Sequence, residues 1–209
     1  MGLAIRAAQA RGPLRVGIVG LGAGTLAAYG RPGDHYTFYE INPQVVELAK
    51  RDFSFLRDSP AKIVIVSGDA RLALEEEAPQ GFDVLAVDAF SGDAIPVHLL
   101  TREAFETYFR HLKPEGVLAV HISNSYLNLK PVVERAAAWF GKQALDVTNP
   151  NDDSMGVFRS NWILIATPPE SQGAPEMRRA GVPQARSPSF RLWTDDYSNL
   201  LGILKWSLD

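Results

Sequence analysis

The chain of 209 residues is long enough for one domain with a sizeable core, since 46% of its residues are hydrophobic and 22% are charged. Its formal net charge of −3 disfavours a nucleic-acid-binding role. The lack of cysteine excludes disulfides and zinc–sulfur sites. A membrane-spanning helix needs about 18 consecutive apolar residues, and no run in the sequence approaches that length. We therefore expect a cytoplasmic protein.

Short runs rich in valine, isoleucine and leucine alternate with helical patterns along the chain. The predicted strands are 15–21, 36–41, 62–67, 83–89, 116–123 and 161–167, with a weaker strand at 144–148. The predicted helices are 42–56, 96–112 and 129–141, followed by a short helix within 192–206. This alternation predicts an α/β fold, in which helices cover both faces of a doubly wound, mostly parallel sheet.

A glycine-rich turn, GLGAGT, follows the first predicted strand. Gly20, Gly22 and Gly24 let the backbone turn tightly and approach a ligand, and the next helix would point its N-terminus at the same place. From Gly20 the pattern G-x-G-x-G is typical of sites for S-adenosylmethionine, whereas from Gly22 it fits a loose dinucleotide fingerprint. A simple tight connection between strand and helix is the alternative.

Carboxylates end the second and third predicted strands. Glu40 could accept both hydroxyls of a ribose, or it could be a solvated residue at a strand end. Asp69 could accept the exocyclic amine of an adenine, or it could cap a helix that starts at Ala70. Together with the glycine turn, these positions predict a ligand that contains adenosine.

The fourth predicted strand ends at Asp88. Ligands of open α/β sheets bind outside the carboxyl ends of the strands, where the winding direction reverses. If the first and fourth strands are neighbours, Asp88 faces the glycine turn, where a carboxylate could hold an amine and accept its proton. A turn or a helix cap is the alternative for Asp88, and also for Asp93, which would precede a helix near Pro96.

The motifs GLGAGT, YEIN, SGDAR and AVDAFSGDAIP, in this order and spacing, resemble the spermidine synthase (polyamine aminopropyltransferase) family, in particular its bacterial spermidine synthase-like branch. The resemblance implies the class I methyltransferase fold with a seven-stranded, mostly parallel, Rossmann-like sheet. It also implies decarboxylated S-adenosylmethionine or S-adenosylmethionine as co-substrate, and an amine such as putrescine as acceptor.

The resemblance further implies roles for individual residues. Glu40 would hold the ribose, Asp69 and Ala70 the adenine, and Asp88 would orient and deprotonate the amine, while Ile41 completes the expected nucleotide site.

The composition predicts an organisation for the whole chain, because the residues after the last strand are rich in proline, glycine, arginine and serine. Residues 1–168 would be the catalytic domain, with 169–209 as a loop or lid and a C-terminal helix packed on it. A homodimer and a membrane-spanning partner domain are further expectations.

Three departures from the family pattern leave other functions open. Ala23 replaces the aspartate of the family's glycine loop, about fourteen residues precede the first strand, and Asp93 is shifted by two positions. A small-molecule methyltransferase, a non-catalytic adenosyl-binding domain and a nicotinamide-dependent dehydrogenase are the alternatives.

Polar residues near the C-terminus could supply further contacts to a diamine. Asp195 and Asp196 could provide anions, unless Thr194 caps the final helix and both acids favour its N-terminus. His121, within HISNSY, could line the pocket. The four histidines show no metal-ligand spacing, so we expect no metal site.

Overall fold

The computed structural model describes residues 1–89, 96–151, 158–167, 182–183 and 190–205. The chain divides into two compact units: Met1–Ala89 with Thr107–Leu118, and Phe90–Glu106 with Ala119–Asp209. Within the described ranges, no helix has the length and apolar character needed to cross a membrane.

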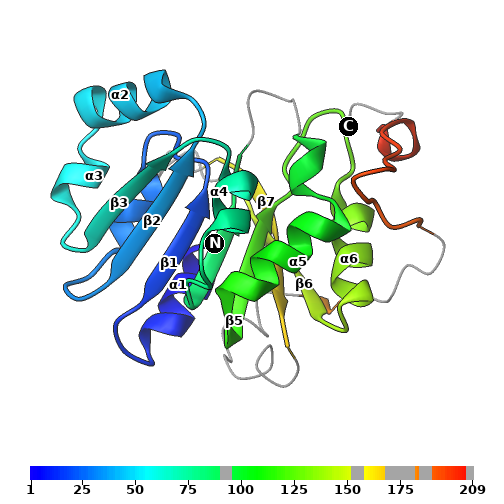
Figure 1. Ribbon diagram of the computed structural model, residues 1–209, viewed down its shortest axis with the longest axis horizontal. Coiled ribbons are helices and arrows are strands. Elements are labelled where there is room, and N and C mark those ends of the chain that lie inside the picture. The colour runs from blue at the N-terminus through cyan, green and yellow to red at the C-terminus, as the bar shows by residue number, and fades with distance from the viewer. Residues whose placement is uncertain (90–95, 152–157, 168–181, 184–189, 206–209) are drawn as a thin grey trace. The chain divides into compact units, whose positions relative to one another are not determined.

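The first unit contains the predicted nucleotide-binding strands. Its elements are α1 (Gly2–Gln9), β1 (Arg15–Val19), the 3₁₀ helix η1 (Thr25–Tyr29), β2 (His35–Glu40), α2 (Pro43–Asp52), α3 (Phe55–Asp58), β3 (Lys62–Ser67), α4 (Ala70–Glu76) and β4 (Phe82–Val87), with parts of α5 (Arg102–His111) and β5 (Leu112–His121) (Figure 1). The strand order is β3-β2-β1-β4-β5, and β1 pairs in parallel with both β2 and β4. The winding direction therefore reverses between β1 and β4, which meets the condition that the first and fourth strands are neighbours.

Burial explains why these strands read as continuous apolar runs. Every residue of β4 is buried, as is every residue of β1 after Arg15. By contrast, β3 ends the strand order of this unit, and each of its residues is exposed or half-buried.

The second unit is built around an antiparallel pair. It contains η2 (Val97–Leu99), α6 (Lys130–Trp139), β6 (Gln143–Asn149), β7 (Ser160–Ala166), β8 (Val182–Pro183) and η3 (Leu201–Ile203), together with the other parts of α5 and β5. The order is β5-β7-β6-β8, in which β6 is antiparallel to both neighbours. The expected fold class, a mostly parallel seven-stranded sheet with helices, is confirmed by β1 to β7.

Several helical predictions are wrong in detail. The helix expected over 42–56 breaks where Phe53 adopts extended backbone (φ −122°, ψ 153°), and the one expected over 96–112 begins with η2 before α5 starts. Over 192–205, the described part of the last predicted helix, no α-helix forms: a bridge joins Thr194 to Tyr197, and the short 3₁₀ helix η3 follows. Helix α1 was not predicted.

Candidate functional site

The glycine turn after β1 adopts backbone conformations that favour glycine. Gly20, Gly22 and Gly24 have φ angles of 94°, 52° and 79°, in the left-handed region where a side chain is strained. The Gly20 N–H donates to the Tyr39 carbonyl at 2.8 Å, and the Gly24 N–H donates to the Leu21 carbonyl at 2.9 Å. The element that follows is not an α-helix but the five-residue 3₁₀ helix η1.

Glu40 connects three loops at the carboxyl ends of the strands. Its side chain is buried, and Oε2 accepts the Leu21 N–H of the glycine turn at 2.9 Å. Oε1 accepts the Asn42 N–H at 2.8 Å, and the Glu40 carbonyl accepts the Gly68 N–H at 2.9 Å. An ionised carboxylate offers about four lone-pair positions, so each oxygen retains acceptor capacity beyond its one backbone N–H.

The residues after Glu40 combine an apolar surface with a helix start. Ile41 is 68% exposed, which is unusual for a large aliphatic side chain. Asn42 caps α2 by accepting the Gln44 N–H at 2.9 Å, and Pro43 occupies the first turn. An exposed apolar side chain at the end of a strand could pack against the face of a nucleoside.

Asp69 is the N-cap of α4. Its Oδ1 accepts the Leu72 N–H at 3.0 Å, and the following Ala70 is buried. The capping function that the sequence offered as an alternative is therefore present. Contact of Asp69 and Ala70 with an adenine stays a prediction.

Asp88 follows β4 directly beside the glycine turn. Its N–H donates to the Val19 carbonyl at 2.8 Å, and a Cβ atom added to Gly20 would come within 2.3 Å of the Asp88 carbonyl oxygen. Only glycine at position 20 allows the two backbones to approach so closely. The turn and Asp88 thus meet at the reversal of the sheet.

The other predicted acidic residues do not belong to the first unit. Asp93 lies outside the described residues. Asp195 lies in the second unit, where its Oδ1 accepts the Thr101 hydroxyl at 2.8 Å and its N–H donates to Glu103 at 3.1 Å. Asp196 is exposed in the same segment. Because the predicted final helix is absent, Thr194 does not cap it.

The polar residues after β5 form a connected group in the second unit. His121 Nε2 lies 2.7 Å from the Ser123 hydroxyl, which accepts the Asn161 N–H at 2.8 Å. The His121 ring stacks on Trp162 with 4.6 Å between centroids. Across the described ranges, no three histidine, cysteine or acidic side chains gather as a metal site.

Sequence reasoning missed two contacts of the glycine turn. One is the Leu21 amide, whose bond to Glu40 has no side-chain signature. The other is Leu56, whose side chain would lie 2.9 Å from a Cβ added to Gly24. The apolar character of the α3 segment is the signal that could have indicated the second contact.

Both the relatives in sequence and the neighbours in structure include aminopropyltransferases or spermidine synthases and also methyltransferases. No family model matches the chain. The chain is 34% identical over 199 residues to the polyamine aminopropyltransferase of Vibrio vulnificus, a match that covers 91% of the chain. The chain spans only 63% of that relative's length.

Solved structures share the fold at low sequence identity. A probable spermidine synthase from Corynebacterium glutamicum aligns with a TM-score of 0.65 and 22% identity, covering 95% of this chain and 81% of that one. Human methyltransferase-like protein 13, solved with S-adenosylhomocysteine (SAH), aligns with a TM-score of 0.60 and 24% identity, covering 94% and 93%. At these identities, the likeness establishes the methyltransferase fold.

Proposed function

The chain is spermidine synthase-like in sequence and fold, and from this premise we propose that it is a transferase that binds an adenosyl co-substrate and alkylates an amine. The observation that carries the proposal is the contact between the glycine turn and Asp88 at the reversal of the sheet. It brings a nucleotide-binding turn and a carboxylate suited to an amine into one unit.

The proposed nucleotide site extends over the carboxyl ends of β1, β2 and β3. The three glycines would let the backbone approach the ligand, Glu40 and Ile41 would contact the ribose side, and Asp69 with Ala70 the adenine. The co-substrate would be decarboxylated S-adenosylmethionine or S-adenosylmethionine. The similarity to a polyamine aminopropyltransferase supports the decarboxylated form.

The proposed chemistry requires an amine with a free lone pair. Asp88 would hold the ammonium form of the acceptor, such as putrescine, and take up the proton that the amine loses. The nitrogen then forms a bond to the aminopropyl carbon next to the sulfonium. The carbon–sulfur bond breaks with its electron pair on sulfur, which releases methylthioadenosine. Asp93, Asp195 and Asp196 remain proposed contacts to the amine.

Product analysis by mass spectrometry tests the reaction. Both forms of S-adenosylmethionine would be offered with a mixture of di- and polyamines, and we expect an aminopropylated amine together with methylthioadenosine. Asp88→Asn should abolish turnover but keep binding of methylthioadenosine in calorimetry. The exposed Asp52→Asn is a matched control and should keep both. Failure to bind any adenosyl ligand would refute the proposal.

Methyl transfer is the second candidate function. Ala23 stands where the family pattern has an aspartate that reads the amino end of the nucleotide side chain, and one structural neighbour is a methyltransferase-like protein with SAH. Transfer of a labelled methyl group to the acceptor, without methylthioadenosine, would identify this reaction. Binding without any turnover would instead indicate a non-catalytic adenosyl-binding domain.

A further inference from the structure

The first unit contains a pocket outside the proposed nucleotide site, which we name the β3 pocket. It has a volume of about 360 Å³, and its lining residues are Lys50, Phe53, Leu56, Arg57, Ile63 and Ile65. These residues come from α2, the turn after it, α3 and β3, which lie together at one edge of the unit (Figure 1). Small-molecule sites typically measure about 300–1,000 Å³, so the pocket is large enough for a ligand.

The β3 pocket exists because its floor has little cover. Ile63 and Ile65 lie two residues apart on β3 and therefore share one face of the strand. They are only half-buried, because the helix predicted over 42–56 breaks at Phe53 and α3 is only four residues long. Phe53 is 44% exposed and stacks on Phe55. An apolar floor with an exposed aromatic ring is typical of a ligand site.

The charged groups that line the pocket are both cationic. Lys50 forms no ion pair with any residue that the structure describes. Arg57 contacts Asp58 at 3.1 Å, but both side chains are largely exposed, so the pair is weak and the guanidinium can accept another anion. Among the residues that the structure describes, no acidic side chain lines the pocket. The charge therefore selects for a negative ligand.

We propose that the β3 pocket binds an amphipathic anion. Its alkyl chain would lie on the four apolar side chains, and its carboxylate or phosphate would pair with Lys50 and Arg57. None of the residues proposed to bind the adenosyl ligand lines this pocket. Its wall nevertheless reaches the glycine turn, because Leu56 packs against Gly24.

Calorimetry on the whole chain with four ten-carbon ligands below their micellar concentrations tests the proposal. Decanoate and decyl phosphate carry the two anionic head groups, decanol is uncharged, and decylamine is cationic. We expect the anion that binds better to bind at least tenfold more tightly than decanol, and decylamine not to bind. The affinity for that anion should fall as salt is added. The ratio of the two anions identifies the preferred head group.

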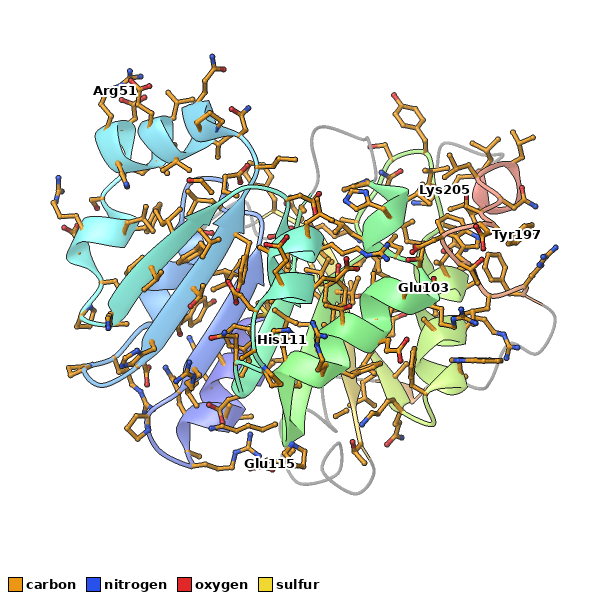
Figure 2. All side chains as sticks on the ribbon, viewed as in Figure 1. Arg51, Glu103, His111, Glu115, Tyr197 and Lys205 are labelled. Atoms are coloured by element: carbon orange, nitrogen blue, oxygen red, sulfur yellow. The ribbon has the colours of Figure 1, made fainter. Side chains whose placement is uncertain are left out.

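A charge-reversal variant with a matched control completes the test. Lys50→Glu/Arg57→Glu should lower the affinity for the preferred anion at least tenfold. Arg51→Glu is the matched control, because it reverses a charge on α2 outside the pocket. The Arg51 side chain pairs with Glu47 and Asp52 (Figure 2). This variant should bind the preferred anion as tightly as the parent does. Circular dichroism would verify that both variants fold.

Equal affinity for all four ligands, or equal losses of affinity in both variants, would overturn the proposal. Because the readout needs neither an adenosyl ligand nor turnover, it is independent of the proposed reaction.

Discussion

The buried carboxylate of Glu40 accepts the backbone N–H of Leu21 at 2.9 Å, and so connects the end of β2 to the glycine turn after β1. Its other oxygen accepts the N–H of Asn42 at 2.8 Å. Hydrogen bonds from backbone donors to a buried charged acceptor are among the stronger ones in proteins. Glu40 therefore fixes the turn before any ribose is bound.

We expect Glu40→Gln to impair more than ribose recognition. A glutamine has one acceptor oxygen, so its NH₂ group must face either the Leu21 or the Asn42 N–H, and one backbone donor loses its partner. The unfolding free energy should fall by about 1–3 kcal/mol. Affinity should fall both for methylthioadenosine and for its 2′,3′-dideoxy analogue. Urea unfolding and calorimetry measure the two effects.

Glu47→Gln is the matched control, because Glu47 is an exposed residue of α2 that contacts only Arg51 among the described residues. It should leave stability and affinity unchanged. If Glu40→Gln weakened only the ligand that carries the ribose hydroxyls, Glu40 would be a ribose contact without a function in the turn.

Gly20 and Gly22 allow a second comparison. A methyl group at Gly20 would meet the Asp88 carbonyl oxygen at 2.3 Å, whereas one at Gly22 would meet nothing within 4 Å. Both positions have positive φ, so both alanine variants carry a backbone cost of about 1–2 kcal/mol. Only Gly20→Ala should in addition displace Asp88.

We expect Gly20→Ala to lose turnover, measured by methylthioadenosine formation. It should also lower the free energy of unfolding, measured in urea, by more than Gly22→Ala does. Similar losses in both variants would show that the contact with Asp88 does not matter.

The sequence predicts the ends of the strands of the first unit well. The glycine turn and Asp88 each follow a strand directly, Glu40 is the last residue of β2, and parallel strands bring their carboxyl ends to one edge. Strand burial on both faces made these elements visible as apolar runs. The alternation of strands and helices predicts a parallel sheet, but the position of the reversal beside β1 comes from the observed pairing with β4.

Tertiary contacts explain what the sequence did not predict. The apolar spacing of 42–56 suits one helix, but the chain turns at Phe53 and packs Leu56 against Gly24. Near the C-terminus, Trp193 is buried and its carbonyl accepts the Arg102 N–H at 2.9 Å, so the segment follows α5 rather than forming a helix. Hydrogen bonds between segments far apart in the chain leave no local periodicity.

Thr101 offers a test of how the C-terminal segment is held in the second unit. Its hydroxyl donates to Asp195 at 2.8 Å from a buried position. Thr101→Val keeps the shape but removes this donor and also the acceptor of the Ala104 N–H at 3.4 Å, so the unfolding free energy should fall by about 1 kcal/mol or more. Limited proteolysis should cut the segment around Asp195 faster. Asp196→Asn, at an exposed neighbour, should change stability by less than about 0.5 kcal/mol. If Thr101→Val left both stability and proteolysis unchanged, this hydrogen bond would not hold the segment.

His111 is a buried imidazole in the first unit, at the end of α5 (Figure 2). Nε2 lies 2.7 Å from the Leu74 carbonyl, which requires a hydrogen on that nitrogen. Nδ1 then accepts the Gln80 N–H at 3.3 Å, so the neutral ring satisfies both contacts. Burial lowers the pKa of His111 below its usual 6.5. Protonation of Nδ1 would replace an acceptor with a second donor facing the Gln80 N–H.

The stability of the chain should therefore depend on His111 at mildly acidic pH. Below about pH 6.5 the unfolded chain binds a proton at this residue while the folded chain resists it, so the unfolding free energy falls as the pH decreases. Above that pH the ring is neutral in both states and contributes no slope. His111→Gln removes this titration, and its stability should decline less than that of the parent between pH 6.5 and 5 in urea unfolding. The exposed His35→Gln should follow the parent curve. If the curves of the parent and His111→Gln ran parallel over this range, another group would be responsible for the acid sensitivity.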